Sequence, residues 1–97
     1  MIKLTEELEG LYQGYRGDEA WEKFVNNFPE APDADFLEFG IPGDIVKTLI
    51  SKVGPVNHSK KWLVSNIPAL DYCKPIDILR DYDNGEIVIR SVLMRMP

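Results

Sequence analysis

Residues that commonly carry out chemistry are scarce in this sequence. It contains one cysteine, Cys73, and one histidine, His58. A single cysteine cannot form an internal disulfide, which fits a reducing compartment, so we expect a cytoplasmic protein. A catalytic histidine needs a nucleophile and an orienting carboxylate within reach, but the adjacent Ser59 would point about 100° away on a helix. We therefore expect a surface histidine and a partly buried free thiol.

Patterns for metal ions, phosphate groups and membranes are also missing. The sequence has no zinc-ligand spacing and no glycine-rich phosphate loop. The segment Asp81–Glu86 begins like a calcium loop, but Gly85, Glu86 and Val92 stand where that loop requires other residues. No apolar run approaches the roughly 20 residues of a membrane span, and the N-terminus lacks a signal-peptide core. We expect no enzyme activity, cofactor, metal ion or membrane association.

Negative charge is concentrated in the first half of the chain. Residues 1–50 contain eleven acids and four bases, a net charge of −7, whereas residues 51–97 contain five acids and seven bases, a net charge of +2. An acidic half is poorly suited to neutralising phosphates, so nucleic acid is not an expected partner. This half either forms an ordinary solvated face or offers a surface to a basic partner.

Length and hydrophobic pattern favour one small helical domain. A chain of 97 residues, of which 44% are hydrophobic, has the size and composition of one globular domain. Apolar residues recur at helical spacing in short segments that glycine and proline separate. We expect an all-α bundle of about five to six short helices over residues 1–97, divided into an acidic N-terminal helical part, residues 1–54, and a second part, residues 55–97.

Apolar stripes and turn residues predict where the first helices lie. The expected segments are residues 4–15, Glu19–Phe28, Ile45–Val53 and His58–Ser65, with a single turn near Phe36. Thr5, Asp18 and Asn57 are the expected N-caps of the first, second and fourth helices. Because glycine costs about 1 kcal/mol in a helix interior, the first helix should be marginal or broken near Gly14. Gly54 and the proline that follows should stop the third helix.

The last third of the chain, from Lys60 to Pro97, carries the most ordered pattern. Pro75 suits the first turn of a helix, because its φ is fixed and its missing N–H is not needed there. Asn84 and the glycine after it mark a turn, and a stripe follows at i, i+3, i+4 and i+7: Ile89, Val92, Leu93 and Met96. The β-branched run Ile87–Ile89 would also suit a strand, but apolar residues do not alternate there. We predict a final helix that Asn84 caps.

The end of the chain is basic and rich in thioether groups, through Arg90, Met94, Arg95, Met96 and Pro97. Arginine and methionine are favoured in protein interfaces, because of forked hydrogen bonding and adaptable packing respectively. The alternative is a frayed terminus whose stripe residues pack in the core. The residues alone leave both interpretations open.

A longer pattern runs through the last third. It consists of Trp62, Leu63, Pro68, Leu70, Pro75, Ile76, Asp77, Ile78, Leu79, Gly85, Ile89, Leu93 and Arg95. In order and spacing these residues resemble the toxin-binding domain of the MbcA/ParS/Xre antitoxin family, whose pattern is roughly W-L, P-x-L, P-[IL]-D-[IL]-[IL], a glycine after a turn, and [VI]-x-x-x-L-x-R. Where that family usually has glycine before its second proline, this chain has Asp71–Lys74.

The resemblance implies a non-catalytic antitoxin of a type II toxin–antitoxin pair, with residues 55–97 as the toxin-binding part. Members of this family bind a cognate protein toxin, often a RES-type toxin that consumes NAD, and their C-terminal end reaches toward its active site. The resemblance places the toxin contact on Arg90, Leu93, Met94, Arg95, Met96 and Pro97. It places Trp62, Pro75, Ile76, Leu79 and Val92 in the domain core. The alternative is a stand-alone interaction or localisation adaptor that forms homo-oligomers, such as a homodimer, and has no toxin partner.

Overall fold

The computed structural model describes residues 1–31 and 33–96. The α-helices within them are α1 (Glu6–Gln13), α2 (Asp18–Val25), α3 (Gly43–Lys52), α4 (Val56–Leu63), α5 (Pro75–Asp81) and α6 (Gly85–Met94). Two 3-10 helices, η1 (Asp33–Phe39) and η2 (Pro68–Leu70), lie in the connections. The described residues contain two isolated β-bridges and no β-strand. The predicted all-α fold is confirmed.

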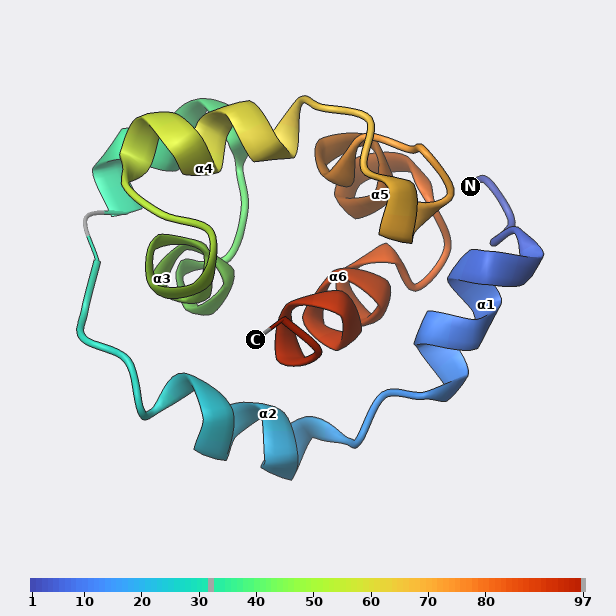
Figure 1. Ribbon diagram of the computed structural model, residues 1–97, viewed down its shortest axis with the longest axis horizontal. Coiled ribbons are helices and arrows are strands. Elements are labelled where there is room, and N and C mark those ends of the chain that lie inside the picture. The colour runs from blue at the N-terminus through green and yellow to red at the C-terminus, as the bar shows by residue number, and fades with distance from the viewer. Residues whose placement is uncertain (32, 97) are drawn as a thin grey trace.

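Helix α6 lies at the centre of the molecule, and the other helices form a ring around it (Figure 1). Helices α1, α2, α3 and α5 all contact it. Its buried apolar residues are Val88, Ile89, Val92 and Leu93. These four positions span an arc of about 140° around the helix, and the buried Ser91 widens the buried arc to about 200°. Helix α6 is therefore enclosed over more than half of its circumference. The choice of a helix over a strand for this segment is confirmed.

A glycine caps one end of each of the first two helices. The Thr5 side chain accepts a hydrogen bond of 3.4 Å from the Leu8 N–H, and α1 ends at Gly14, so both predicted limits are confirmed. The predicted cap of α2 is wrong by one residue: Gly17 is the N-cap, with φ 97°, which glycine adopts readily. Helix α2 ends at Val25, before the predicted end, because Pro29 has no N–H to donate to the Val25 carbonyl four residues earlier.

Two α-helices of the second half start at or directly after a proline. Helix α4 begins at Val56, and the carbonyl of Pro55 accepts the N–H of Ser59 at 2.9 Å. Asn57 therefore lies inside the first turn, and its prediction as the cap is wrong. Helix α5 begins at Pro75 as predicted. Asn84 occupies the N-cap position of α6 with φ 55°, but its side chain makes no capping hydrogen bond.

The N-terminal residues are fastened to the turn between α5 and α6. The Ile2 N–H donates to the Asp81 carbonyl at 2.8 Å, and the Asp83 N–H donates to the Ile2 carbonyl at 2.9 Å. This short parallel bridge fixes the chain just before α1. It helps to hold α1 beside α6.

Both halves of the chain contribute to one hydrophobic core. Its buried members are Leu8, Leu11, Trp21, Val25, Phe36, Ile45, Val46, Leu49, Leu63, Leu70, Ile76, Ile78, Val88, Ile89, Val92 and Leu93. Eight of these sixteen belong to the acidic first half. Of the residues expected in the core, Pro75, Ile76 and Val92 are buried, and Trp62 and Leu79 pack against it partly exposed.

Helices α5 and α6 approach each other most closely at Gly85. Gly85 is buried, and a β-carbon added to it would overlap the carbonyl oxygen of Ile78 and lie 2.7 Å from the carbonyl carbon. Those are backbone atoms, so they cannot move aside without shifting α5. The close approach of the two helices therefore requires glycine at this position.

We expect Gly85→Ala to lower the free energy of unfolding by about 1–3 kcal/mol, the range of overpacking in a tight core. Gly10→Ala is the matched control. Gly10 lies inside α1, and an added β-carbon there meets nothing within 4 Å. The control should gain up to about 1 kcal/mol, because alanine favours a helix over glycine. Urea unfolding measures both, and a Gly85→Ala variant as stable as wild type would contradict the close approach.

Candidate protein-binding site

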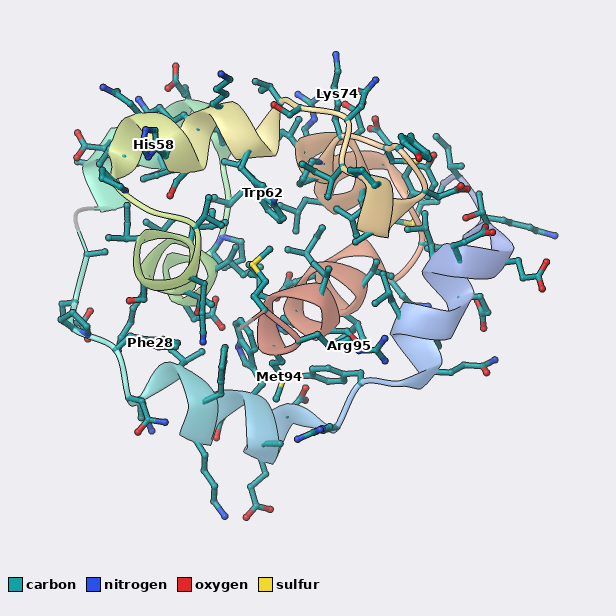
Figure 2. The ribbon with its side chains drawn as sticks, in the orientation of Figure 1. Phe28, His58, Trp62, Lys74, Met94 and Arg95 are labelled. Carbon is teal, nitrogen blue, oxygen red and sulfur yellow. The ribbon has the colours of Figure 1, made fainter. Side chains whose placement is uncertain are left out.

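Helix α6 ends at Met94, and Arg95 and Met96 follow it. We call these three residues the α6 tip; Figure 2 labels Met94 and Arg95. The Arg95 side chain is exposed, and the two methionines are half-buried. The Lys52 ammonium donates a hydrogen bond of 3.5 Å to the Met96 carbonyl, which connects the tip to α3. The tip therefore presents its side chains from an anchored backbone.

Leu93 and Arg90, two of the residues expected to contact a partner, do not belong to the α6 tip. Leu93 is fully buried. The Arg90 side chain is only 16% exposed and is held by ion pairs within the molecule. Both positions are therefore corrected to structural roles. The α6 tip, Met94 to Met96, stays the predicted contact surface, and Pro97 lies outside the described residues.

Arg90 joins three helices through its guanidinium group. One terminal nitrogen, Nη1, donates to the Tyr15 hydroxyl at 3.2 Å and to Asp18 Oδ1 at 3.3 Å. The other, Nη2, donates to Glu86 Oε1 at 2.7 Å and lies 3.6 Å from Asp44 Oδ2. Asp18 begins α2, Asp44 lies in the first turn of α3, and Glu86 in that of α6. The cluster therefore ties α2 and α3 to the central helix.

An aromatic ring completes the cluster. The Arg90 guanidinium carbon lies 5.3 Å from the centroid of the Trp21 ring, a distance at which cation–π attraction acts. The Trp21 indole N–H donates to Asp44 Oδ2 at 2.8 Å. The Nε atom of Arg90 is buried and finds no acceptor among the described residues. The guanidinium is thus held mainly through its two terminal nitrogens and its flat face.

Burial and polar contacts both shift the pKa values of Tyr15 and Arg90. Burial is the main cause that raises the pKa of Tyr15, and the hydrogen bond to Asp18 adds to it, whereas Arg90 lowers it. For Arg90, burial lowers the pKa, but contacts with Tyr15, Glu86 and Asp44 outweigh it, so the pKa is raised. The guanidinium therefore stays charged under all ordinary conditions.

An apolar hollow adjoins the α6 tip. Its volume is about 540 Å³, and it lies where α1, η2 and the end of α6 meet. Its lining residues are Glu7, Gly10, Leu11, Ile67, Ala69, Val92, Arg95 and Met96. A recess of this kind beside an exposed arginine suits an apolar side chain of a partner protein, since such anchors dominate many interfaces.

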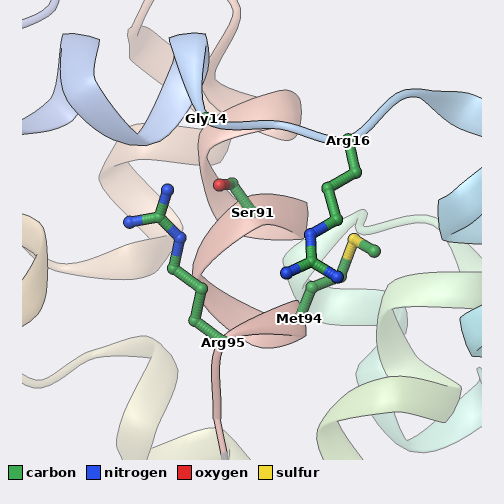
Figure 3. A pocket seen from close by; sticks show the side chains of 5 residues that line it. All are labelled: Gly14, Arg16, Ser91, Met94 and Arg95. Atoms are coloured by element: carbon green, nitrogen blue, oxygen red, sulfur yellow. The ribbon is translucent and has the colours of Figure 1, made fainter.

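A second hollow, which is polar and has a volume of about 420 Å³, also borders Arg95 (Figure 3). Gly14, Arg16, Ser91 and Met94 complete its lining. Gly14 and Arg16 lie far from the other lining residues in the sequence, and no sequence pattern connects the two groups. A helix prediction does place Ser91 and Arg95, four apart, on one face of α6. Arg16 gives no such local signal, because only the packing of α1 against α6 brings it there.

The residues with reactive or metal-binding side chains lie apart. His58 is exposed on α4 (Figure 2). The half-buried Cys73 thiol lies 3.6 Å from the Tyr82 hydroxyl, and this hydrogen bond is the main cause that raises the pKa of Tyr82. Within residues 1–31 and 33–96, no cluster of three or more histidine, cysteine or acidic side chains is arranged to hold a metal ion. Each helix of that part is too short or too polar for a membrane crossing.

No protein-family model matches this chain, and no curated protein or solved structure matches it significantly.

We expect Arg90→Met to lower the free energy of unfolding by about 1–3 kcal/mol, because it leaves three carboxylates near one another without their cation. This loss of stability is smaller than the loss expected for a fully buried ion pair, since the Asp18 side chain is 75% exposed. Arg80→Gln is the control. Arg80 forms an exposed pair with Asp77, so its loss should cost no more than about 0.5 kcal/mol. Equal stability of the two variants in urea unfolding would contradict the linking role of Arg90.

We also expect the protein to lose stability in alkaline solution, partly through Tyr15. Its pKa in the folded state is raised above 10.0, so the folded state holds the phenol proton more tightly than the unfolded state. This contribution is complete below pH 10.0 and is lost as pH rises through the folded-state pKa. In Tyr15→Phe the free energy of unfolding should fall less steeply over that range. Identical slopes for the variant and the wild type would refute the assignment.

Proposed function

We propose that this protein is a non-catalytic antitoxin, acting in the cytoplasm, that binds a cognate protein toxin with its α6 tip. One observation carries the proposal: a buried, anchored helix ends in an exposed arginine between two methionines, directly beside an apolar hollow. Such a surface combines the two residue types that interfaces favour with a recess for an anchor side chain. The resemblance of the last third to a toxin-binding domain also supports the α6 tip as the binding surface, since Arg95 is the last residue of the matching pattern.

The mechanism that we propose is steric. The guanidinium group of Arg95 carries a permanent charge and five N–H donors, so it suits a pocket built for an anionic substrate. In a RES-type toxin that consumes NAD, the tip would enter that pocket and exclude the nucleotide. The apolar hollow would receive a side chain from the rim of the toxin. A fixed backbone helps here, because a flexible tip would lose conformational entropy on binding.

A stand-alone homo-oligomeric adaptor is the second candidate function. Large apolar side chains are exposed at Leu37, Val64 and Tyr72, with exposed fractions of 76%, 47% and 68%. None of them belongs to the α6 tip or lines its hollows. Each of these side chains offers an apolar contact for self-association away from the tip.

The test is a pull-down of the protein, tagged at its N-terminus and expressed at its native level in its own host. We expect one stoichiometric partner that is toxic when expressed alone and harmless together with this protein. Arg95→Asp, and truncation after Met94, should weaken the complex about tenfold or more, as loss of a central interface residue does. Lys61→Asp, an exposed charge reversal on α4, should leave the affinity unchanged.

The variants separate the two candidate functions. A toxic partner that binds wild type and Arg95→Asp equally well would refute the α6 tip as the interface. Recovery of this protein alone, together with a dimer in sedimentation that Tyr72→Asp disrupts, would favour the adaptor.

A further inference from the structure

Two arginine side chains converge on the polar hollow from different parts of the chain. Arg16 comes from the connection between α1 and α2, and Arg95 from the end of α6. Figure 3 shows their guanidinium groups on either side of Ser91. In the described part of the chain, neither arginine forms an ion pair with an acid, and this includes Glu7, which lines the neighbouring hollow. Two like charges that face one hollow favour an anion between them.

Ser91 also lines the polar hollow, and Figure 3 shows its hydroxyl on the side of Arg95. The residue is 1% exposed, and its hydroxyl has no hydrogen-bond partner among the described residues. A serine inside a helix often bonds back to the carbonyl four residues earlier, but this one does not. A buried hydroxyl without a partner is destabilising, and an acceptor in the hollow would relieve that cost.

The charge balance of the hollow stays positive. The C-terminal ends of α1 and α6 both lie here, and each helix end contributes about half a negative charge. The two guanidinium groups contribute about one positive charge each, so roughly one positive charge remains. This excess stands out in a chain whose net charge is −5.

The number of donors selects the anion. Two guanidinium forks and one hydroxyl offer more donors than the two oxygens of a carboxylate can accept, whereas a phosphate group has three or four oxygens. The volume of about 420 Å³ also leaves room beyond a phosphate for the rest of a small molecule. We propose that the hollow formed by Gly14, Arg16, Ser91, Met94 and Arg95 binds a phosphate group, either free phosphate or a small phosphate ester.

Phosphate binding can be measured without a toxin partner, because the experiment uses the isolated protein. Isotope-labelled protein at neutral pH is titrated with sodium phosphate, phenyl phosphate, sodium acetate and sodium chloride at matched ionic strength, and backbone and arginine N–H signals are followed by NMR. We expect saturable shifts at Arg16, Ser91 and Arg95 with phosphate, weaker binding of acetate and no saturation with chloride. Tighter binding of phenyl phosphate identifies an ester as the ligand, and equal binding identifies free phosphate.

Substitutions test each donor. Arg16→Gln and Arg95→Gln should each weaken phosphate binding about tenfold or more, because each removes charged hydrogen bonds. Ser91→Ala should weaken it several-fold while the free protein melts at the same or a higher temperature, since an unpartnered hydroxyl is removed. The control Lys61→Gln removes an exposed cation that does not line the hollow, and should bind like wild type.

Gly14 offers a test of geometry apart from charge. Its φ of −81° suits any residue, but a β-carbon there would overlap the Arg95 guanidinium. Gly14→Ala should therefore push Arg95 aside without removing its charge, and weaken phosphate binding about as much as Arg95→Gln. Shifts that do not saturate, or that spread equally to Lys61, would overturn the proposal. So would acetate binding as strong as phosphate, or unchanged affinity in both arginine variants.

Discussion

The fold depends on the enclosure of α6. The longest helices in the described part of the chain, α3 and α6, have ten residues each, and the other α-helices have seven or eight. Isolated helices below about 12 residues are marginal in water even with favourable sequences. The surrounding helices therefore draw much of their stability from the apolar faces that they bury, four of them against α6 itself. Such a structure should form cooperatively, since no short helix is stable by itself.

Some acidic residues of the first half form ion pairs with basic residues of the second half. Asp18 and Asp44 of the acidic half pair with Arg90 of the basic half, and Glu38 pairs with Lys60 at 3.0 Å. The two halves are thus joined by ion pairs as well as by the shared hydrophobic core. These ion pairs are directional, so they help to fix how the helices pack. They account for some of the acidic excess without an external basic partner.

Features that depend on neighbours in sequence were predictable, and features that depend on the fold were not. The stop of α1 at Gly14 and the start of α5 at Pro75 follow from local backbone preferences, and the structure confirms both. The prediction of Asn57 as the N-cap was wrong because the carbonyl of Pro55 already accepts the first hydrogen bond of α4. The role of Arg90 could not be predicted from the sequence, because its partners Tyr15 and Asp18 are 75 and 72 residues away along the chain.

The two arginines of α6 show how one helix can hold both a structural and a recognition residue. Arg90 and Arg95 are five positions apart, which turns them by about 140° around the axis, so one faces α2 and α3 while the other faces α1. Arg95 alone borders both hollows of the proposed site. A phosphate in the polar hollow and an anionic group of a partner would draw on the same positive charge. Their binding free energies must then be coupled, and thermodynamic reciprocity requires each to weaken the other by the same factor.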